Sequence, residues 1–152
     1  MTDSNAESRI VSASREIAAP AHEIFELIAD PAQQSRWDGN DNLAEAPTGQ
    51  RVSRAGEVFT MTLTTGAVRH NRVVEFEEGS RIAWLPAEPD RQPPGHLWRW
   101  EVEPMSEARS RVTHTYDWSQ LSDPKRLERA RATTTGKLMA SLDNLARLAE
   151  EH

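Results

Sequence analysis

Between residues 57 and 118 the chain alternates apolar and polar side chains with a period of two, and turn residues interrupt the alternation at short intervals. This is the period of a β-strand, whose successive side chains point to opposite faces of a sheet. The expected strands are residues 57–64, 67–77, 80–85, 96–103 and 109–118. Residues 10–17 alternate in the same way and predict a further strand near the N-terminus.

The remaining segments predict helices and loops. Pro20 opens a short helix, because a proline at the first helical position loses no hydrogen bond. Asp30-Pro31 ends that helix, and Pro31 begins a second short helix that ends near Trp37. Residues 38–50 predict a loop and residues 51–54 a short edge strand. Strands followed by a helix favour an α+β fold over a parallel sheet.

The C-terminal segment predicts one continuous helix over residues 124–150, with Asp123 as its cap and Pro124 in its first position. A mainly apolar pattern recurs at helical spacing: Leu127, Ala130, Thr134, Leu138, Leu142, Leu145 and Ala149. Residues 133–136 (TTTG) are a weak point in this helix, since three β-branched residues precede a glycine. They predict either a kink that gates a cavity or a close approach of helix to sheet.

Length and composition exclude several classes of protein. A chain of 152 residues predicts a single domain, 1–152, with residues 1–8 as a frayed tail. The absence of cysteine excludes thiol catalysis and disulfides, and the net charge of −6 argues against binding of nucleic acid. No apolar stretch approaches the length of a membrane span, and the first residues lack the features of a signal peptide, so we expect a cytoplasmic protein.

Three groups of residues resemble one family. The segment Ile17–Phe25 (IAAPAHEIF), followed by Asp30-Pro31 and Arg36-Trp37, resembles the opening of the polyketide cyclase/dehydrase branch of the START/Bet v 1-like (SRPBCC) superfamily. Residues 73–76 with 79–84 are similar to its central hairpin, and residues 98–102 and 111–114 to its last two strands. The resemblance covers about residues 9–150.

The resemblance implies a helix-grip fold: a curved antiparallel sheet of about seven strands around a long C-terminal helix, with two short helices after the first strand. It also implies a cavity for an apolar ligand between the sheet and that helix. Members of this superfamily share no catalytic motif, so the resemblance names no reaction.

Strand alternation then predicts which side chains face the cavity. The inward set comprises Phe59, Met61, Leu63, Val68, His70, Arg72, Val74, Phe76, Trp98, Trp100, Val102, Val112, His114, Tyr116 and Trp118. The residues expected to bind a ligand are Phe59, Met61, His70, Arg72, Trp84, Trp98, Trp100, His114, Tyr116, Thr134 and Leu138. Most are apolar, as in a typical small-molecule pocket.

The polar minority suggests chemistry. A buried arginine without a partner costs several kcal/mol, so Arg72 needs a partner, a ligand or water. Arg72 could hold a carbonyl or carboxylate while His114 and Tyr116 exchange protons, an arrangement suited to aldol-type cyclisation or dehydration. Alternatively these residues form a satisfied polar cluster, or Arg72 reaches solvent at one end of the sheet.

Other motifs are uninformative. Residues 122–125 match S-x-x-K but lie where a helix cap belongs. The five histidines are scattered over different elements, so we expect neither a metal nor a cofactor. The loops 38–50 and 86–95 either rim the cavity or are ordinary solvated loops.

Three functions remain open from the sequence. The first is a protein that binds one small hydrophobic molecule, polycyclic or lipid-like, in the cavity. The second is an enzyme, a polyketide cyclase or dehydratase that uses His114, Tyr116 and Arg72. The third is an interaction module resembling the Hsp90-activator branch, which would need a large exposed apolar patch. The sequence leaves the oligomeric state open.

Overall fold

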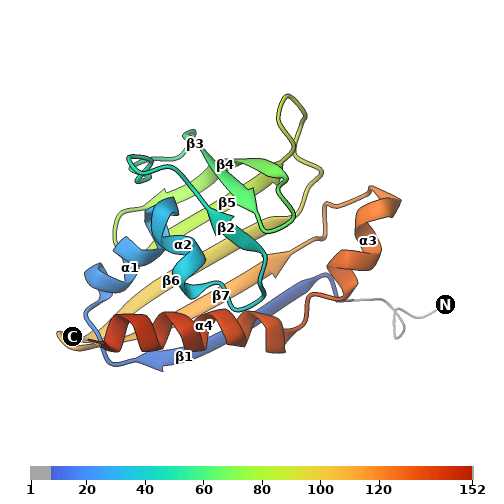
Figure 1. Cartoon of the computed structure of the whole chain (residues 1–152). Coiled ribbons are helices and arrows are strands. Elements are labelled where there is room, and N and C mark those ends of the chain that lie inside the picture. Colours follow the sequence, from blue (N-terminus) through green and yellow to red (C-terminus); the bar gives the residue numbers. More distant parts are fainter. Residues whose placement is uncertain (1–7, 152) are drawn as a thin grey trace.

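The computed structural model describes residues 8–151, so residues 1–7 of the expected N-terminal tail lie outside the described residues. The elements follow in this order (Figure 1): β1 (Ile10–Ile17), α1 (Ala21–Ala29), α2 (Pro31–Trp37), β2 (Leu43–Glu45), β3 (Val58–Leu63), β4 (Val68–Glu77), β5 (Arg81–Ala87), β6 (Leu97–Ser106), β7 (Arg109–Asp117), α3 (Pro124–Arg131) and α4 (Thr135–Glu150). The strands form one antiparallel sheet in the order β1-β7-β6-β5-β4-β3-β2. The predicted α+β fold is confirmed.

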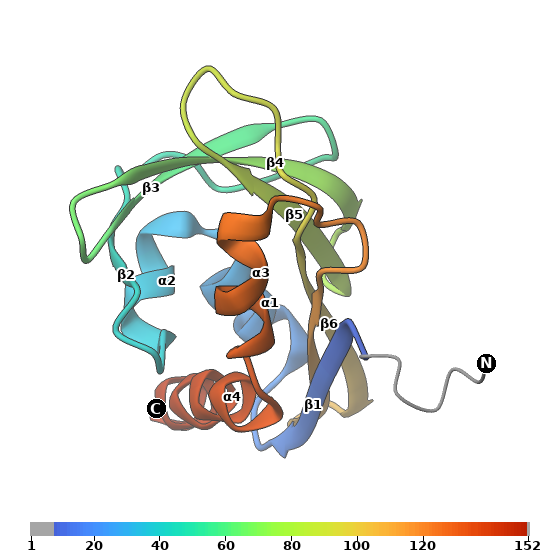
Figure 2. The ribbon, with the colours of Figure 1, turned by 90° about the vertical axis from the view of Figure 1, so that its right-hand side faces the viewer.

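The sheet curls around the short helices. Figure 2 views α4 end-on and shows the curved sheet with α1 and α2 on its inner side. α4 lies along the edge that β1 forms and also packs against α2. Its buried stripe includes Leu138, Leu142 and Leu145, which are almost completely shielded from solvent. Opposite them, the concave face of the sheet contributes Trp100 and Val112 to the same core.

None of the helices in the described part of the chain combines the length and the apolar character needed to cross a membrane.

A β-bulge in β4 overturns part of the predicted inward face. The register of β4 against β5 shifts between Val73 and Glu75. Before the bulge, Asn71 and Val73 point into the core. After it, Phe76 turns inward and packs edge-on against Phe25, with 5.7 Å between the ring centroids. One extra residue in a strand shifts the alternation, so that side chains before and after the bulge with the same spacing point to opposite faces of the sheet. Counting every second residue back from the inward Phe76 therefore assigns the residues before the bulge to the wrong face.

The prediction that the side chains of Val68, His70, Arg72 and Val74 point into the cavity is therefore wrong. Three of them are exposed and His70 is half-buried. The inward positions belong instead to Arg69, Asn71 and Val73.

The predicted continuous C-terminal helix is also wrong, because it breaks into α3 and α4. Thr134 has extended backbone and caps α4, its hydroxyl accepting a hydrogen bond from the backbone N–H of Lys137 at 3.4 Å. Threonine is a good N-cap and a poor residue for the interior of a helix, which explains the break. Gly136 is not needed for close packing, since a side chain there would meet nothing closer than 3.7 Å.

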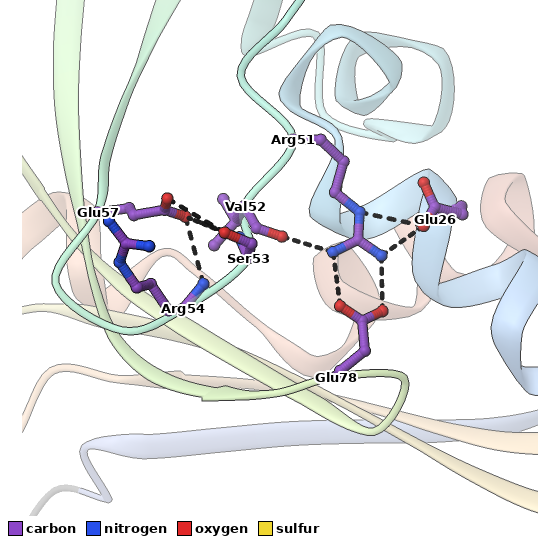
Figure 3. Close-up of polar contacts among 7 residues, drawn as sticks. All are labelled: Glu26, Arg51, Val52, Ser53, Arg54, Glu57 and Glu78. Atoms are coloured by element: carbon purple, nitrogen blue, oxygen red, sulfur yellow. Dashed lines mark hydrogen bonds and ion pairs between the residues drawn. The ribbon is translucent and has the colours of Figure 1, made fainter.

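Residues 51–54 do not form the predicted edge strand; β2, inside the predicted loop 38–50, occupies that edge. The backbone N–H of Val52 donates to the carbonyl of Ala29 at 3.0 Å, so this segment is hydrogen-bonded to the end of α1. Arg51 strengthens the attachment (Figure 3). Its guanidinium contacts Glu26 of α1 and, at 2.7 Å, Glu78 in the turn after β4, and it lowers the pKa of the Glu78 carboxyl.

The same loop is closed on itself by Glu57. Its carboxylate accepts a hydrogen bond from the backbone N–H of Ser53 at 2.7 Å and another from that of Arg54 at 3.3 Å (Figure 3). These bonds lower the pKa of the Glu57 carboxyl, the Ser53 N–H having the larger effect. The backbone N–H groups of Val52, Ser53, Arg54 and Gly56 thus donate within the loop, to α1 or to β4.

Candidate functional site

A cavity of about 370 Å³ lies between the concave face of the sheet, the loop after α2, α3 and the first turns of α4. Ligand pockets generally measure roughly 300–1,000 Å³, so this one suits a small molecule. Its inner wall is mainly aromatic and apolar: Trp37, Met61, Leu63, Trp84, Trp98, Trp100, Tyr116, Leu121 and Leu138.

The aromatic wall follows from the pairing of β6 with β7. Their register places Trp98 opposite Tyr116 and Trp100 opposite His114. The His114 ring stacks on Trp100, with 3.7 Å between the centroids and 15° between the planes. The Trp98 and Tyr116 rings lie 4.3 Å apart. From α2, Trp37 packs edge-on against Trp100 at 4.9 Å, so this wall is continuous from the sheet to the helix.

His114 is neutral in this environment. Its Nδ1 lies 3.2 Å from the carbonyl oxygen of Arg99. Because a carbonyl can accept but not donate, Nδ1 carries the hydrogen and Nε2 is the acceptor nitrogen of the ring. Burial lowers the pKa of His114 to about 3, and the bond to Arg99 offsets a part of that shift.

His96 lines the cavity together with Tyr116. Burial, followed by the positive charges of Arg126, Arg69 and Arg129, lowers the pKa of His96 to about 4. Its Nδ1 is buried without a hydrogen-bond partner in the described part of the chain. Burial raises the pKa of Tyr116 to about 12, so both side chains are uncharged at neutral pH.

The outer end of the cavity is polar. Arg69 of β4, Arg126 and Arg129 of α3, and Lys137 of α4 belong to its lining, together with Asp38 and Asp41 of the loop after α2. The Asp38 carboxylate is engaged with the protein, since it accepts hydrogen bonds from the backbone N–H groups of Asn42 and Leu43, both at 2.7 Å. α3 stands at the end of the molecule opposite the C-terminus of α4 (Figure 1).

The structure brings most of the predicted ligand-binding residues together. Those that line the cavity are Met61, Trp84, Trp98, Trp100, His114, Tyr116 and Leu138. Phe59 lies behind the wall, packed edge-on against Trp84 at 5.3 Å. Thr134 caps α4, and its neighbour Thr133 lines the cavity instead. Contact of these residues with a ligand stays a prediction.

His70 and Arg72 are not part of the cavity, since the bulge in β4 places them on the outer face of the sheet. The proposed catalytic group of His114, Tyr116 and Arg72 therefore does not converge. Sequence reasoning missed Arg69, Asn71 and His96 and the cations of the last two helices. His96 is in phase with Trp98 and Trp100 in the predicted strand 96–103, so the alternation could have found it. The bulge hid the inward side of β4.

Among residues 8–151, no three histidine or acidic side chains are grouped so that they could hold a metal ion. The inner wall of the cavity likewise offers indoles, apolar side chains and a phenol rather than the carboxylates that hard cations prefer.

A family model described as polyketide cyclase / dehydrase and lipid transport matches residues 8–150. Among curated proteins, uncharacterized protein Rv0088 of Mycobacterium tuberculosis is 32% identical over 119 residues, which cover 71% of this chain and 47% of that protein. The chain thus spans about half the length of the curated relatives it matches.

Solved structures share the fold at lower identity. Protein MLL2253 of Mesorhizobium loti superposes with a TM-score of 0.67 at 15% identity, covering 92% of this chain and 96% of that one. The Aha1 dimer from Colwellia psychrerythraea gives a TM-score of 0.65 at 15% identity, covering 93% and 96% of the two chains. At this level of identity the likeness concerns the fold alone.

Proposed function

Because the chain belongs to the polyketide cyclase/dehydrase and lipid transport family, we propose that it binds a small hydrophobic molecule, polycyclic or lipid-like, in the cavity between the sheet and the last two helices. The observation that carries this proposal is the cavity of about 370 Å³ with its aromatic inner wall. Burial of apolar surface contributes roughly 25 cal/mol of favourable free energy per Å² removed from water. The aromatic wall provides apolar surface for a ligand on several sides of the cavity.

Polar groups inside the cavity would orient the ligand. Asn71, which is only 5% exposed, lines the cavity and brings a side-chain amide to it. In two further lining residues, the buried Nδ1 of His96 and Nε1 of Trp100 have no hydrogen-bond partner within the described part of the chain. Buried polar groups are nearly always hydrogen-bonded, so a polar group of the ligand would offer these two atoms a partner. A few polar groups in an apolar wall are typical of a specific binding site.

Binding without a chemical step is better supported than catalysis by the predicted residues. Arg72 lies outside the cavity. The two imidazoles in the cavity have pKa values of about 3 and about 4, whereas a general base works best with a pKa near the operating pH. A cyclase or dehydratase remains the alternative, and turnover of a bound polycyclic ketone would establish it.

No observation favours the interaction module. The exposed large apolar side chains of the described residues are Ile10, Val58, Val68, Val74 and Met105, which belong to four different strands. Single exposed apolar side chains are common on protein surfaces.

The proposal is tested by tryptophan emission during titration with polycyclic ketones, flavonoids, sterols and fatty acids. We expect a saturable change that is selective for one class, because four of the five tryptophans line the cavity. A folded protein that responds to no member of the panel would contradict the proposal.

A substitution at the cavity provides the matched control. Thr133 lines the cavity and is half-buried, whereas Thr135 is exposed and does not line it. We expect Thr133→Trp to weaken binding at least about tenfold by filling the cavity, equivalent to about 1.4 kcal/mol, while Thr135→Trp leaves binding unchanged in calorimetry. Equal affinities of the two variants would place the ligand elsewhere.

A further inference from the structure

Four cationic side chains line the cavity, and three of them, Arg69, Arg126 and Arg129, act on the same neighbouring groups, although the protein as a whole carries a net charge of −6. Arg69 comes from β4, Arg126 and Arg129 from α3, and Lys137 from α4. Four residues from three elements meet here through the tertiary fold, so this positive charge is a property of the site rather than of one segment.

Three of the four cations lack a carboxylate partner among the described residues. Arg126 is neutralised by Glu88 at 2.9 Å and by Asp123 at 3.3 Å. Arg129 donates to the neutral side-chain oxygen of Asn42 at 3.3 Å. Arg69 donates to the backbone oxygen of Val68 at 3.2 Å.

No ion pair within the described part of the chain involves Lys137. The lining contains two acidic residues, Asp38 and Asp41. The Asp38 carboxylate accepts hydrogen bonds from the backbone, and the Asp41 carboxylate offsets part of the positive charge of the cations. The lining itself, with four cations against the two carboxylates of Asp38 and Asp41, is positively charged.

The electrostatics of neighbouring groups agree with this charge distribution. Burial lowers the pKa of Arg69, and repulsion from Arg126 and Arg129 lowers it further, against an opposing effect of Glu88. The same three arginines contribute to the lowered pKa of His96. A partly buried cation that faces other cations is costly without a counter-charge, and an anion at this position would relieve the cost.

We propose that Arg69, Arg129 and Lys137 bind an oxyanion on the ligand, so that the cavity takes amphipathic molecules with an apolar body and a carboxylate or phosphate group. This inference rests on the proposed function, since the apolar body occupies the aromatic wall. A guanidinium donates through two parallel N–H groups to either kind of oxyanion. The head group would lie between β4 and the last two helices, and the body would extend toward Trp98 and Trp100.

The test uses one apolar body with three head groups: 2-naphthoate, 2-naphthyl phosphate and the neutral 2-naphthamide, titrated by calorimetry. We expect at least one anion to bind about tenfold or more tightly than the amide, as charge-assisted hydrogen bonds do. The tighter of the two anions identifies the head group. Added salt should reduce the preference, because it screens charges at the surface.

Variants assign the preference to the named cations. The double variant Arg69→Gln/Arg129→Gln should lose most of the preference for the anion over the amide, because Lys137 is the one proposed cation that it keeps. The control Lys125→Gln removes the same charge from the exposed side of α3, away from the cavity, and should keep the preference. Circular dichroism checks the fold, and Arg129→Gln alone, at an exposed position, should already reduce the preference several-fold.

The outcomes separate the two proposals. Equal binding of all three compounds to the unmodified protein, or an undiminished anion preference in the double variant, would overturn the charge assignment and leave the hydrophobic site standing. Absence of binding by all three compounds would overturn both proposals for aromatic ligands.

Discussion

At the scale of single residues, two glycines with opposite roles show how closely the loop after α2 approaches α4. A Cβ built on Gly39 would lie 2.6 Å from the backbone carbon of Ala140, whereas one built on Gly136 would meet nothing nearer than 3.7 Å. Backbone atoms in a helix cannot move aside cheaply, so the small residue is required at Gly39. The sequence drew attention to Gly136, while the tight contact lies at the other glycine.

We therefore expect Gly39→Ala to destabilise the protein by about 1–3 kcal/mol, the usual cost of overpacking. The same substitution at Gly136 should stabilise it by up to about 1 kcal/mol, because alanine is the better helix former. Urea unfolding of the two variants measures both values. A neutral effect of Gly39→Ala would mean that α4 and the loop are not in close contact.

At the scale of elements, an ion pair connects two strands that are not neighbours. Glu75 of β4 and Arg99 of β6 both pair with Ala83 of β5, one from each side. Their side chains meet across it in two hydrogen bonds of 2.8 and 2.6 Å. Ala83 is fully buried beneath them, so the pair acts as a cover for the middle of the sheet as well as a link.

The hydrogen bond from Arg99 lowers the pKa of the Glu75 carboxyl. A carboxyl with a lowered folded pKa stabilises the fold above its unfolded pKa, and this contribution is lost as the pH falls through the folded value. Arg99→Gln should therefore cost about 1 kcal/mol at neutral pH, and the difference from the unmodified protein should shrink below about pH 4.

Arg81→Gln is the control for this prediction. It removes a 3.5 Å pair with Glu101, in which both side chains are largely exposed, and such pairs contribute little. Equal costs for the two substitutions would show that the geometry of the Glu75–Arg99 pair has no special value.

At the scale of the whole molecule, two buried imidazoles make stability dependent on pH. Burial lowers the pKa of His114 to about 3 and that of His96 to about 4. The unfolded chain takes up these protons near pH 6.5 and the folded protein does not. Stability should consequently fall as the pH decreases below about 6.5, by roughly 1.4 kcal/mol per pH unit for each histidine.

Urea unfolding at several values between pH 7 and pH 5 measures this slope above the range where carboxyl groups titrate. His96→Gln should remove about half of it, whereas His22→Gln, at an exposed position, should leave it intact. A slope that is the same in all three proteins would show that His96 is not buried as a neutral ring.

The sequence alone was sufficient where structure depends on neighbouring residues along the chain. The period of two, the turn residues, the prolines and the cap Asp123 are local signals, and among the described residues they predict every strand except β2, as well as the starts of α1, α2 and α3. The aromatic wall was predictable for the same reason, since β6 and β7 alternate without a bulge across Trp98, Trp100, His114 and Tyr116.

What the tertiary structure decided depends on contacts between distant segments. The phase of β4 follows from its pairing with β5, which accommodates an extra residue, and this moved Arg72 out of the site and Arg69 into it. The segment 51–54 is not a strand because Val52 bonds to the end of α1. The positive end of the cavity arises from residues about sixty positions apart, so no periodicity in the sequence reveals it.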